Sequence, residues 1–410
     1  MALRRLARST GRVLRRVTAN DRFQFFRPPD YPRQRITAKK LLNLYLARYH
    51  YRRGDVKLFS YPHILTIEPT NVCNLRCPYC FTGAGEVGRE VSMMPMELYE
   101  RILNELGDYL FYLELCNWGE PLLNKNLPEM LSAASSKGIS TGISTNFSVP
   151  FDATKAEALV ASGLTRLGVS LDGARQESYE KYRVRGNLER ILQNVRLVNE
   201  AKTKLSSETP IVIWEFHVFE WNKDDIPLAT SMAEELQMQF ALSKGYVEGP
   251  DWDPDAKYPF SLDLFPPGVA PSRCEFPWFH AVINNDGGVP ACCGAFYKEH
   301  DYGSIAGGTF KDVWNNEAFQ NARRLFRSRQ GGAENLICYD CPVTIVWDDY
   351  KRHRAAGRSE ASFTPPFTTN NEAYNYFLQK KPGQPAGSPN DAINLRPVER
   401  PERIPDSLSS

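Results

Sequence analysis

From residue 60 onward, short apolar stretches alternate with longer stretches in which apolar residues recur every three or four positions. The short stretches predict β-strands and the longer ones predict amphipathic helices. We expect strands at residues 64–68, 110–116, 139–145, 164–171, 211–219 and 240–243. The helix after the fourth strand has the clearest apolar face, formed by Leu188, Ile191, Leu192, Val195 and Val198. Strands that alternate with helices predict an α/β fold whose parallel sheet curls into a partial (β/α)6 barrel.

The rest of the chain divides around this barrel. We expect a basic N-terminal extension at residues 1–59, the barrel at 60–265, a small C-terminal β-hairpin and helix domain at 266–350, and a tail at 351–410. Within the extension, residues 38–46 predict a helix that packs on the barrel. The tail is rich in Pro and Ser, a composition that predicts a wrapping or disordered segment.

Composition and charge indicate a globular protein of a reducing compartment. The chain has 410 residues, 42% of them hydrophobic, and its 50 basic and 48 acidic residues leave a net charge of +2. This balance gives no indication of a nucleic-acid partner. The nine cysteines are mostly closely spaced, and no secretory signal is recognisable, which favours metal binding over disulfides. We therefore predict a cytoplasmic protein.

The first residues of the chain are strongly basic. Six arginines precede the first acidic residue, Asp21, and those at positions 4, 8, 12 and 16 share one face of a helix. Such a helix could make peripheral contact with an anionic membrane surface. An organellar transit peptide, or a basic arm without any targeting role, would give the same pattern.

Three cysteines lie in the loop that follows the first predicted strand. Cys73, Cys77 and Cys80 have the spacing C-x3-C-x2-C. Structural zinc normally takes four protein ligands, whereas an iron–sulfur cluster held by three cysteines leaves one iron open for a small molecule. A zinc site with a distant fourth ligand and a chance grouping are the alternatives.

This spacing, with the aromatic Tyr79 just before the last cysteine, resembles the signature of the radical S-adenosylmethionine (SAM) superfamily. The resemblance extends over about residues 60–349 and implies a TIM-like partial barrel. It also implies that the three cysteines hold a [4Fe-4S] cluster that binds SAM. Reductive cleavage of SAM would then give a 5′-deoxyadenosyl radical that abstracts hydrogen from a substrate. A low-potential electron donor such as flavodoxin or ferredoxin is implied as a partner.

Other unusual residues follow the carboxyl ends of the predicted strands, where barrels of this type build their active sites. Gly119, Glu120 and Pro121 follow the second strand and resemble the family's Gly-Glu-Pro motif, which accepts hydrogen bonds from the SAM amino group. The alternative for this segment is an ordinary loop with a surface glutamate.

The third and fourth strands lead to further candidates. The resemblance implies that Asn146 and Ser170 contact the methionine or ribose part of SAM, and that Arg183 contacts its carboxylate. Two other arginines, at positions 185 and 190, are alternatives for the last role. Residues 169–173 resemble the subgroup of the family that carries auxiliary clusters, and capping of the next helix is the alternative role for Asp172.

The fifth strand carries two polar residues at alternate positions. Glu215 and His217 share a face with Ile213, while Trp214 and Phe216 lie on the other face. If the apolar face packs against helices, Glu215 and His217 point into the barrel. We predict that they contact the substrate or accept its proton. Hydrogen-bonded structural residues are the alternative.

A second cysteine set lies in the C-terminal domain. The segment from Cys274 to Cys292, with Cys338 and Cys341, resembles the SPASM/twitch auxiliary-cluster domains. The three further cysteines of the full SPASM pattern are missing, because no cysteine follows Cys341. The resemblance therefore implies one auxiliary [4Fe-4S] cluster held by four cysteines. Cys293 could replace Cys292 as a ligand, and zinc is the alternative metal.

These features predict a radical SAM oxidoreductase. An auxiliary cluster can accept a second electron, and the cysteine spacing is similar to that of an aminocyclitol dehydrogenase, so we expect the two-electron oxidation of a sugar or cyclitol-type small molecule. The first alternative is a ribosomal peptide maturase that crosslinks or oxidises its substrate. The second is a non-catalytic iron–sulfur binding or scaffold protein.

Overall fold

A computed structural model describes residues 31–245, 272–329, 333–359 and 362–363 of the chain. The basic helix predicted for the first residues lies outside this part, and so does most of the predicted tail. Among the described residues, no helix combines the length and the apolarity needed to cross a membrane.

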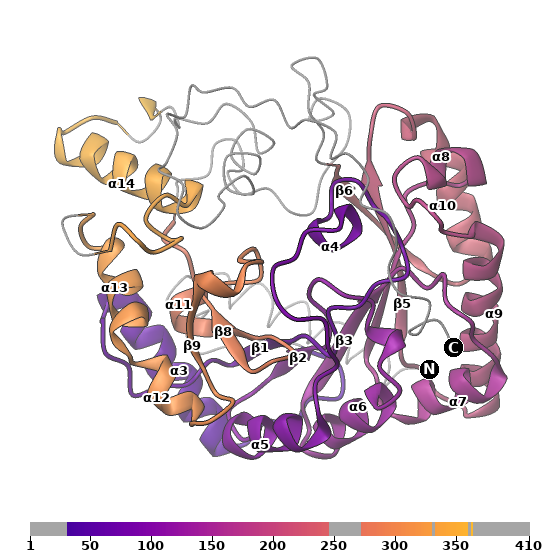
Figure 1. Cartoon of the computed structure of the whole chain (residues 1–410), viewed down its shortest axis with the longest axis horizontal. Coiled ribbons are helices and arrows are strands. Elements are labelled where there is room, and N and C mark those ends of the chain that lie inside the picture. Colours follow the sequence, from indigo (N-terminus) through magenta and orange to yellow (C-terminus); the bar gives the residue numbers. More distant parts are fainter. Residues whose placement is uncertain (1–30, 246–271, 330–332, 360–361, 364–410) are drawn as a thin grey trace, which may run out of the picture.

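One curved, fully parallel sheet forms the centre of the molecule (Figure 1). All six predicted strands are present in it, and a seventh is added. The order across the sheet is β6-β5-β4-β3-β2-β1-β7. The strands are β1 (Ile64–Ile67), β2 (Tyr112–Glu114), β3 (Ser140–Thr145), β4 (Arg166–Ser170), β5 (Ile211–Val218), β6 (Gln239–Lys244) and β7 (His280–Ile283). The predicted α/β partial barrel is thereby confirmed.

Helices connect these strands and cover the outer side of the sheet, as Figure 1 shows for α5, α6, α7 and α9. Apolar side chains such as Leu65, Leu167 and Trp214 are fully buried beneath them. The helices are α4 (Phe81–Ala84), α5 (Met96–Leu106), α6 (Leu127–Ser136), α7 (Ala153–Ala161), α8 (Gln176–Glu180), α9 (Leu188–Lys204) and α10 (Ile226–Glu235). The other side of the sheet carries polar residues together with half-buried apolar ones such as Ile213.

The seventh strand comes from the region that the sequence assigned to a separate C-terminal domain. β7 pairs in parallel with β1, from the pair Ile64 and His280 to the pair Ile67 and Ile283. Without β7, β1 would be an edge strand with unpaired backbone groups. The two regions therefore share one sheet, although the predicted boundary at residue 266 itself lies outside the described residues.

In the described part of the C-terminal region, β7 is accompanied by a hairpin and four α-helices. β8 (Gly288–Pro290) pairs antiparallel with β9 (Asp301–Ser304). The helices are α11 (Phe276–Phe279), α12 (Phe310–Trp314), α13 (Glu317–Leu325) and α14 (Pro342–Ala355). Because α14 continues past residue 350, the first residues of the predicted tail are helical.

A buried arginine attaches this region to the N-terminal extension. Arg323 of α13 is fully buried and donates hydrogen bonds to the carbonyl oxygens of Pro277 (2.8 Å), Val56 (3.0 Å) and Trp314 (2.8 Å). Burial lowers the pKa of its guanidinium to about 9. No single lysine amine could reach all three carbonyls with the same geometry.

The N-terminal extension packs where the sequence predicts. Helix α3 (Ala38–Arg53) includes the predicted residues 38–46 and contacts α11. The residues before it lie near the amino ends of the strands: Tyr31 stacks on Tyr112 of β2, with ring centroids 4.9 Å apart, and the Arg35 amide donates to the Gly138 carbonyl at 2.9 Å. This segment therefore covers part of the end of the sheet opposite the cysteine loop.

Candidate active site

The loop after β1 gathers the first cysteine set. Cys73, Cys77 and Cys80 follow the strand, and α4 begins directly after Cys80. A side chain on Gly83 of α4 would place its Cβ 2.5 Å from both the backbone nitrogen and oxygen of Cys77. Only glycine therefore allows α4 to lie this close to the loop.

The chemistry of this loop suits a positively charged metal group. Burial and the neighbouring Glu120 raise the pKa of Cys73 to about 12, and burial raises that of Cys77 to about 11. Buried thiolates so close together repel one another, and bound iron removes that penalty. None of the nine cysteines, all of which lie in described residues, forms a disulfide.

Glu120 joins three loops at the carboxyl end of the sheet. Its side chain is buried and accepts hydrogen bonds from the Thr145 hydroxyl (2.6 Å), the Leu122 amide (3.1 Å) and the Asn146 amide (2.8 Å). The Glu120 amide donates to the Val72 carbonyl beside the cysteine loop. Burial raises the pKa of this carboxyl to about 7. The predicted contact with the SAM amino group stays a prediction.

The residues next to Glu120 are also close to the cysteine loop. A Cβ on Gly119 would lie 2.0 Å from the Thr70 carbonyl oxygen, so this position requires glycine. The side-chain Nδ2 of Asn146 lies 3.8 Å from the Cys73 sulfur and donates to Asn74 Oδ1 at 3.0 Å. The structure thus brings the predicted residues 119–121 and Asn146 together around the first cysteine set.

Asp172 connects two further candidates, Arg183 and His217. Its Oδ2 accepts from Arg183 Nε at 2.5 Å, and its Oδ1 accepts from the His217 amide (2.7 Å) and pairs with His217 Nδ1 (2.9 Å). The alternative that Asp172 caps a helix is wrong: α8 begins at Gln176, and Asp172 is fully buried. Burial opposes its ionisation, but Arg183 and His217 lower its pKa to about 2.

Arg183 extends this network to the first cysteine set. Its Nη1 lies 4.0 Å from the Cys77 sulfur, and only 13% of its side chain is exposed. Arg183 therefore stands between a cysteine of the loop and the Asp172 carboxylate. Ser170, two residues before Asp172, contacts the Ser144 hydroxyl at 3.4 Å.

The side chains of β5 alternate as predicted. Ile213, Glu215 and His217 are half-buried, whereas Trp214 and Phe216 are buried in the core beneath the helices. Glu215 accepts from the Ser144 hydroxyl at 2.7 Å and from Arg166 at 2.9 Å. Glu215 and His217 thus lie on the polar, concave side of the sheet.

Sequence reasoning missed several polar neighbours on this side. Glu114 of β2 accepts a hydrogen bond from the Tyr112 hydroxyl, and the Cys116 thiol lies 3.5 Å from its other oxygen. Burial raises the pKa of Glu114. Alternate positions 112, 114 and 116 of the second predicted strand were a usable signal for this face. Arg166 and Ser170 likewise occupy alternate positions of the fourth predicted strand, so the same signal applied to Arg166.

The second cysteine set also comes together. Cys274, Cys292, Cys338 and Cys341 line one small, mostly apolar cavity, whereas Cys293 is exposed and is not part of its wall. Burial strongly raises the pKa of Cys274 and Cys292, and the neighbouring thiols add to the effect. Within the described residues, no group of His, Cys, Asp or Glu is arranged to hold a single metal ion.

Comparison with known proteins identifies the two regions of the chain that contain these cysteine sets. Residues 67–215 match the family model of the radical SAM superfamily, and residues 274–342 match that of the SPASM iron–sulfur cluster-binding domain. The chain is a radical SAM protein with a SPASM domain. These two domains imply SAM and [4Fe-4S] clusters as its cofactors, and both cysteine sets fit that chemistry.

The relatives of this radical SAM protein differ in their reactions. Fe-coproporphyrin III synthase of Methanosarcina barkeri is 30% identical over 167 residues, which are 40% of this chain and 39% of that protein. PqqA peptide cyclase of Bradyrhizobium diazoefficiens is 26% identical over 125 residues, 30% of this chain and 32% of that protein. The matches thus span about a third to two fifths of these relatives.

A solved structure supports the fold. Streptococcus suis SuiB bound to S-adenosylmethionine aligns over 78% of each chain with a TM-score of 0.54 and 17% identity. At this identity the similarity concerns the fold alone. The radical SAM protein therefore keeps the architecture of SuiB, and its own side chains have to indicate what it binds.

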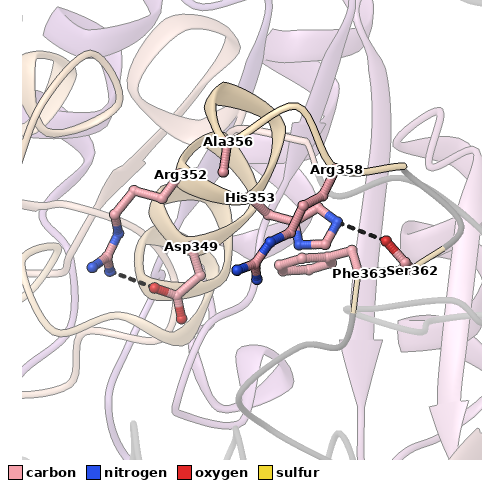
Figure 2. Close-up of a pocket in the computed structure, with 7 residues that line it drawn as sticks. All are labelled: Asp349, Arg352, His353, Ala356, Arg358, Ser362 and Phe363. Carbon is pink, nitrogen blue, oxygen red and sulfur yellow. Dashed lines mark hydrogen bonds and ion pairs between the residues drawn. The ribbon is translucent and has the colours of Figure 1, made fainter.

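A further, open pocket lies at the end of α14 and contains none of the predicted residues. Figure 2 shows the residues that line it: Asp349, Arg352, His353, Ala356, Arg358, Ser362 and Phe363. Asp349 pairs with Arg352, and His353 contacts the Ser362 hydroxyl at 3.1 Å. These polar groups bind one another, so we assign no function to the pocket.

Proposed function

We propose that this radical SAM protein is an oxidoreductase that takes two electrons from an alcohol of a sugar or cyclitol-type molecule. The cavity lined by the four cysteines of the second set is the observation that carries the proposal. Four thiolates complete the coordination of a [4Fe-4S] cluster, so no iron is left open for the substrate. Such a cluster suits an electron acceptor, which a radical reaction needs in order to end as a two-electron oxidation.

The first cysteine set would hold the SAM-binding cluster. When bound, this cluster and SAM supply a 5′-deoxyadenosyl radical that removes hydrogen from a substrate carbon. We assign the SAM amino group to residues 119–121, its ribose or methionine part to Asn146 and Ser170, and its carboxylate to Arg183. The contacts of Glu120 and Asn146 with the loops around Cys73 support this assignment, because they fix these groups before the cofactor binds.

The concave side of the sheet would receive the substrate. Its polar groups, Glu215, His217, Ser144 and Glu114, offer donors and acceptors for several hydroxyls. We infer that Glu215 and His217 contact the substrate and that one of them takes its proton. The Tyr31 and Tyr112 rings stack near the opposite end of the sheet and would help to exclude water there.

Anaerobic reconstitution tests the proposal. We expect about eight irons per chain, and 5′-deoxyadenosine should form from SAM with dithionite or with reduced flavodoxin. Perdeuterated glucose and myo-inositol should transfer deuterium into 5′-deoxyadenosine and yield a ketone or aldehyde. Absence of 5′-deoxyadenosine would favour a scaffold protein. Formation of 5′-deoxyadenosine without deuterium from any sugar or cyclitol in a broader panel would refute the proposed substrate class.

A peptide substrate is the second candidate. It is supported by the match to PqqA peptide cyclase, and the SuiB fold has also been solved with its precursor peptide SuiA bound. A short precursor gene beside the gene for this chain would favour it, and glycosyltransferase or aminotransferase genes would favour a sugar. Co-expression with such a precursor should then change the peptide mass by the loss of two hydrogens. A cytoplasmic location and a flavodoxin or ferredoxin donor remain part of the proposal.

A further inference from the structure

Two histidine–aspartate pairs occur in the described part of the chain. They differ in whether the second ring nitrogen of the histidine has a hydrogen-bond partner. His50 Nδ1 pairs with Asp55 Oδ2 at 2.8 Å, and His217 Nδ1 pairs with Asp172 Oδ1 at 2.9 Å. The second ring nitrogen of His50 is also engaged, because it lies 3.2 Å from the Phe59 amide that donates to it. Among the described residues, the second ring nitrogen of His217 has no hydrogen-bond partner, and 31% of that side chain is exposed.

We propose that Asp172 is a positioning residue that fixes His217 as the proton acceptor of the reaction, with ring Nε2 directed at the substrate. The inference rests on the proposed function. It names which of the two candidate residues, Glu215 or His217, accepts the proton. A carboxylate only accepts hydrogen bonds, so the ring proton has to be on Nδ1. The lone pair is then on Nε2, which is the nitrogen without a partner.

The contacts of Asp172 hold this arrangement. One carboxylate oxygen accepts from both the amide and the ring of His217, and the other accepts from Arg183. Asn222 donates to the carbonyl oxygens of Asp172 (3.0 Å) and His217 (2.9 Å), which ties the two backbones together. Among the described residues, the charged group that contacts the ring is Asp172, and Arg183 lies behind it.

Glu215 is less suited to accept the proton. Arg166 contacts one of its oxygens and the Ser144 hydroxyl donates to the other. Both of its oxygens are therefore already engaged, whereas the second ring nitrogen of His217 has no partner among the described residues. We therefore assign Glu215 to orienting the substrate or to keeping the concave side ordered.

The reaction balances with His217 in this role. Oxidation of the alcohol breaks one C–H and one O–H bond and forms a C=O bond. The hydrogen atom leaves to the radical derived from SAM, the hydroxyl proton leaves to His217 Nε2, and the remaining electron requires the acceptor of the SPASM domain. The resulting positive ring is next to the Asp172 carboxylate, which stabilises it.

The first experiment measures the tautomer of the ring without any turnover. The reconstituted protein, labelled with ¹⁵N histidine and kept oxidised without SAM, is studied by long-range ¹H–¹⁵N correlation, and His217→Gln assigns the signal. We expect the proton on Nδ1 of His217. In Asp172→Asn the amide can donate to Nδ1, so the Nε2–H form should increase, as the equivalent substitution does in serine proteases. A wild-type ring in the Nε2–H form overturns the inference, whatever the substrate.

The second experiment measures the product formed per 5′-deoxyadenosine with the deuterated sugar or cyclitol that the wild type oxidises. Loss of a general base should lower this ratio by roughly 100-fold in Asp172→Asn and His217→Gln. The matched control, Asp55→Asn, should leave the ratio unchanged, and His50 should keep its proton on Nδ1 because the Phe59 amide donates to its Nε2. A changed His217 tautomer with an unchanged ratio overturns the inference. A wild-type protein that oxidises no sugar or cyclitol overturns the proposed function instead.

Discussion

Gly83 offers a test of how closely α4 and the first cysteine set must pack. An alanine there would place its Cβ 2.5 Å from the backbone nitrogen and oxygen of Cys77, which cannot rotate away. To reach an ordinary contact of about 3.4 Å, α4 and the loop would have to separate by roughly 0.9 Å. Overpacking of this kind costs about 1–3 kcal/mol, and the better helix propensity of alanine returns at most about 1 kcal/mol. We therefore expect Gly83→Ala to disturb the cysteine loop.

The loss of iron caused by Gly83→Ala should be confined to the cluster of the first cysteine set. Iron and sulfide analysis after anaerobic reconstitution should fall from about eight irons per chain to about four, since the SPASM cysteines are unaffected. 5′-Deoxyadenosine formation should fall with it. Gly307→Ala is the matched control, because nothing lies within 4 Å of a Cβ at that position. A Gly83→Ala protein with full iron content and wild-type SAM cleavage would show that the packing argument is wrong.

Three further predictions concern other parts of the chain. Cys292→Ser should lose about half of the iron, whereas Cys293→Ser should keep all of it, as measured by iron analysis. Burial raises the pKa of Glu68 to about 7, so the folded state holds its proton more tightly and stability should fall as pH rises from about 4.5 to about 7. Glu68→Gln should therefore raise the unfolding temperature at pH 8 and leave it nearly unchanged at pH 4.5; equal effects at both would contradict this. Arg323→Lys should lower the unfolding temperature by roughly the equivalent of 2 kcal/mol, because its amine cannot serve three carbonyls.

Much of the fold follows from patterns that are local in the sequence. Each of the six predicted strands is preceded or followed by a helix with a regular apolar face, so its type and its parallel pairing could be predicted. β7 could not be placed in the sheet, because the four residues His280–Ile283 say nothing about which strand they pair with. Its position depends on the free edge of β1, which is a property of the folded sheet.

The sequence also predicted part of the candidate site. Cysteine spacing indicated both sets, and alternation along the fifth strand placed Glu215 and His217 on one face. The partners of these residues were not predictable, since Asp172 and Arg166 lie on another strand or just beyond it. The choice between Cys292 and Cys293 also required the structure, because adjacent residues in a loop give no periodicity to distinguish them.

The backbone hydrogen bonds between β1 and β7 have a consequence for electron flow. The cysteine loop follows the end of β1, and Cys274 and Cys292 flank β7, so a ladder of paired residues connects the first cysteine set with two cysteines of the second set. Any hinge motion between the sites would have to break that ladder. In the proposed reaction, the distance between the electron donor and the electron acceptor should therefore be set by strand register and stay constant.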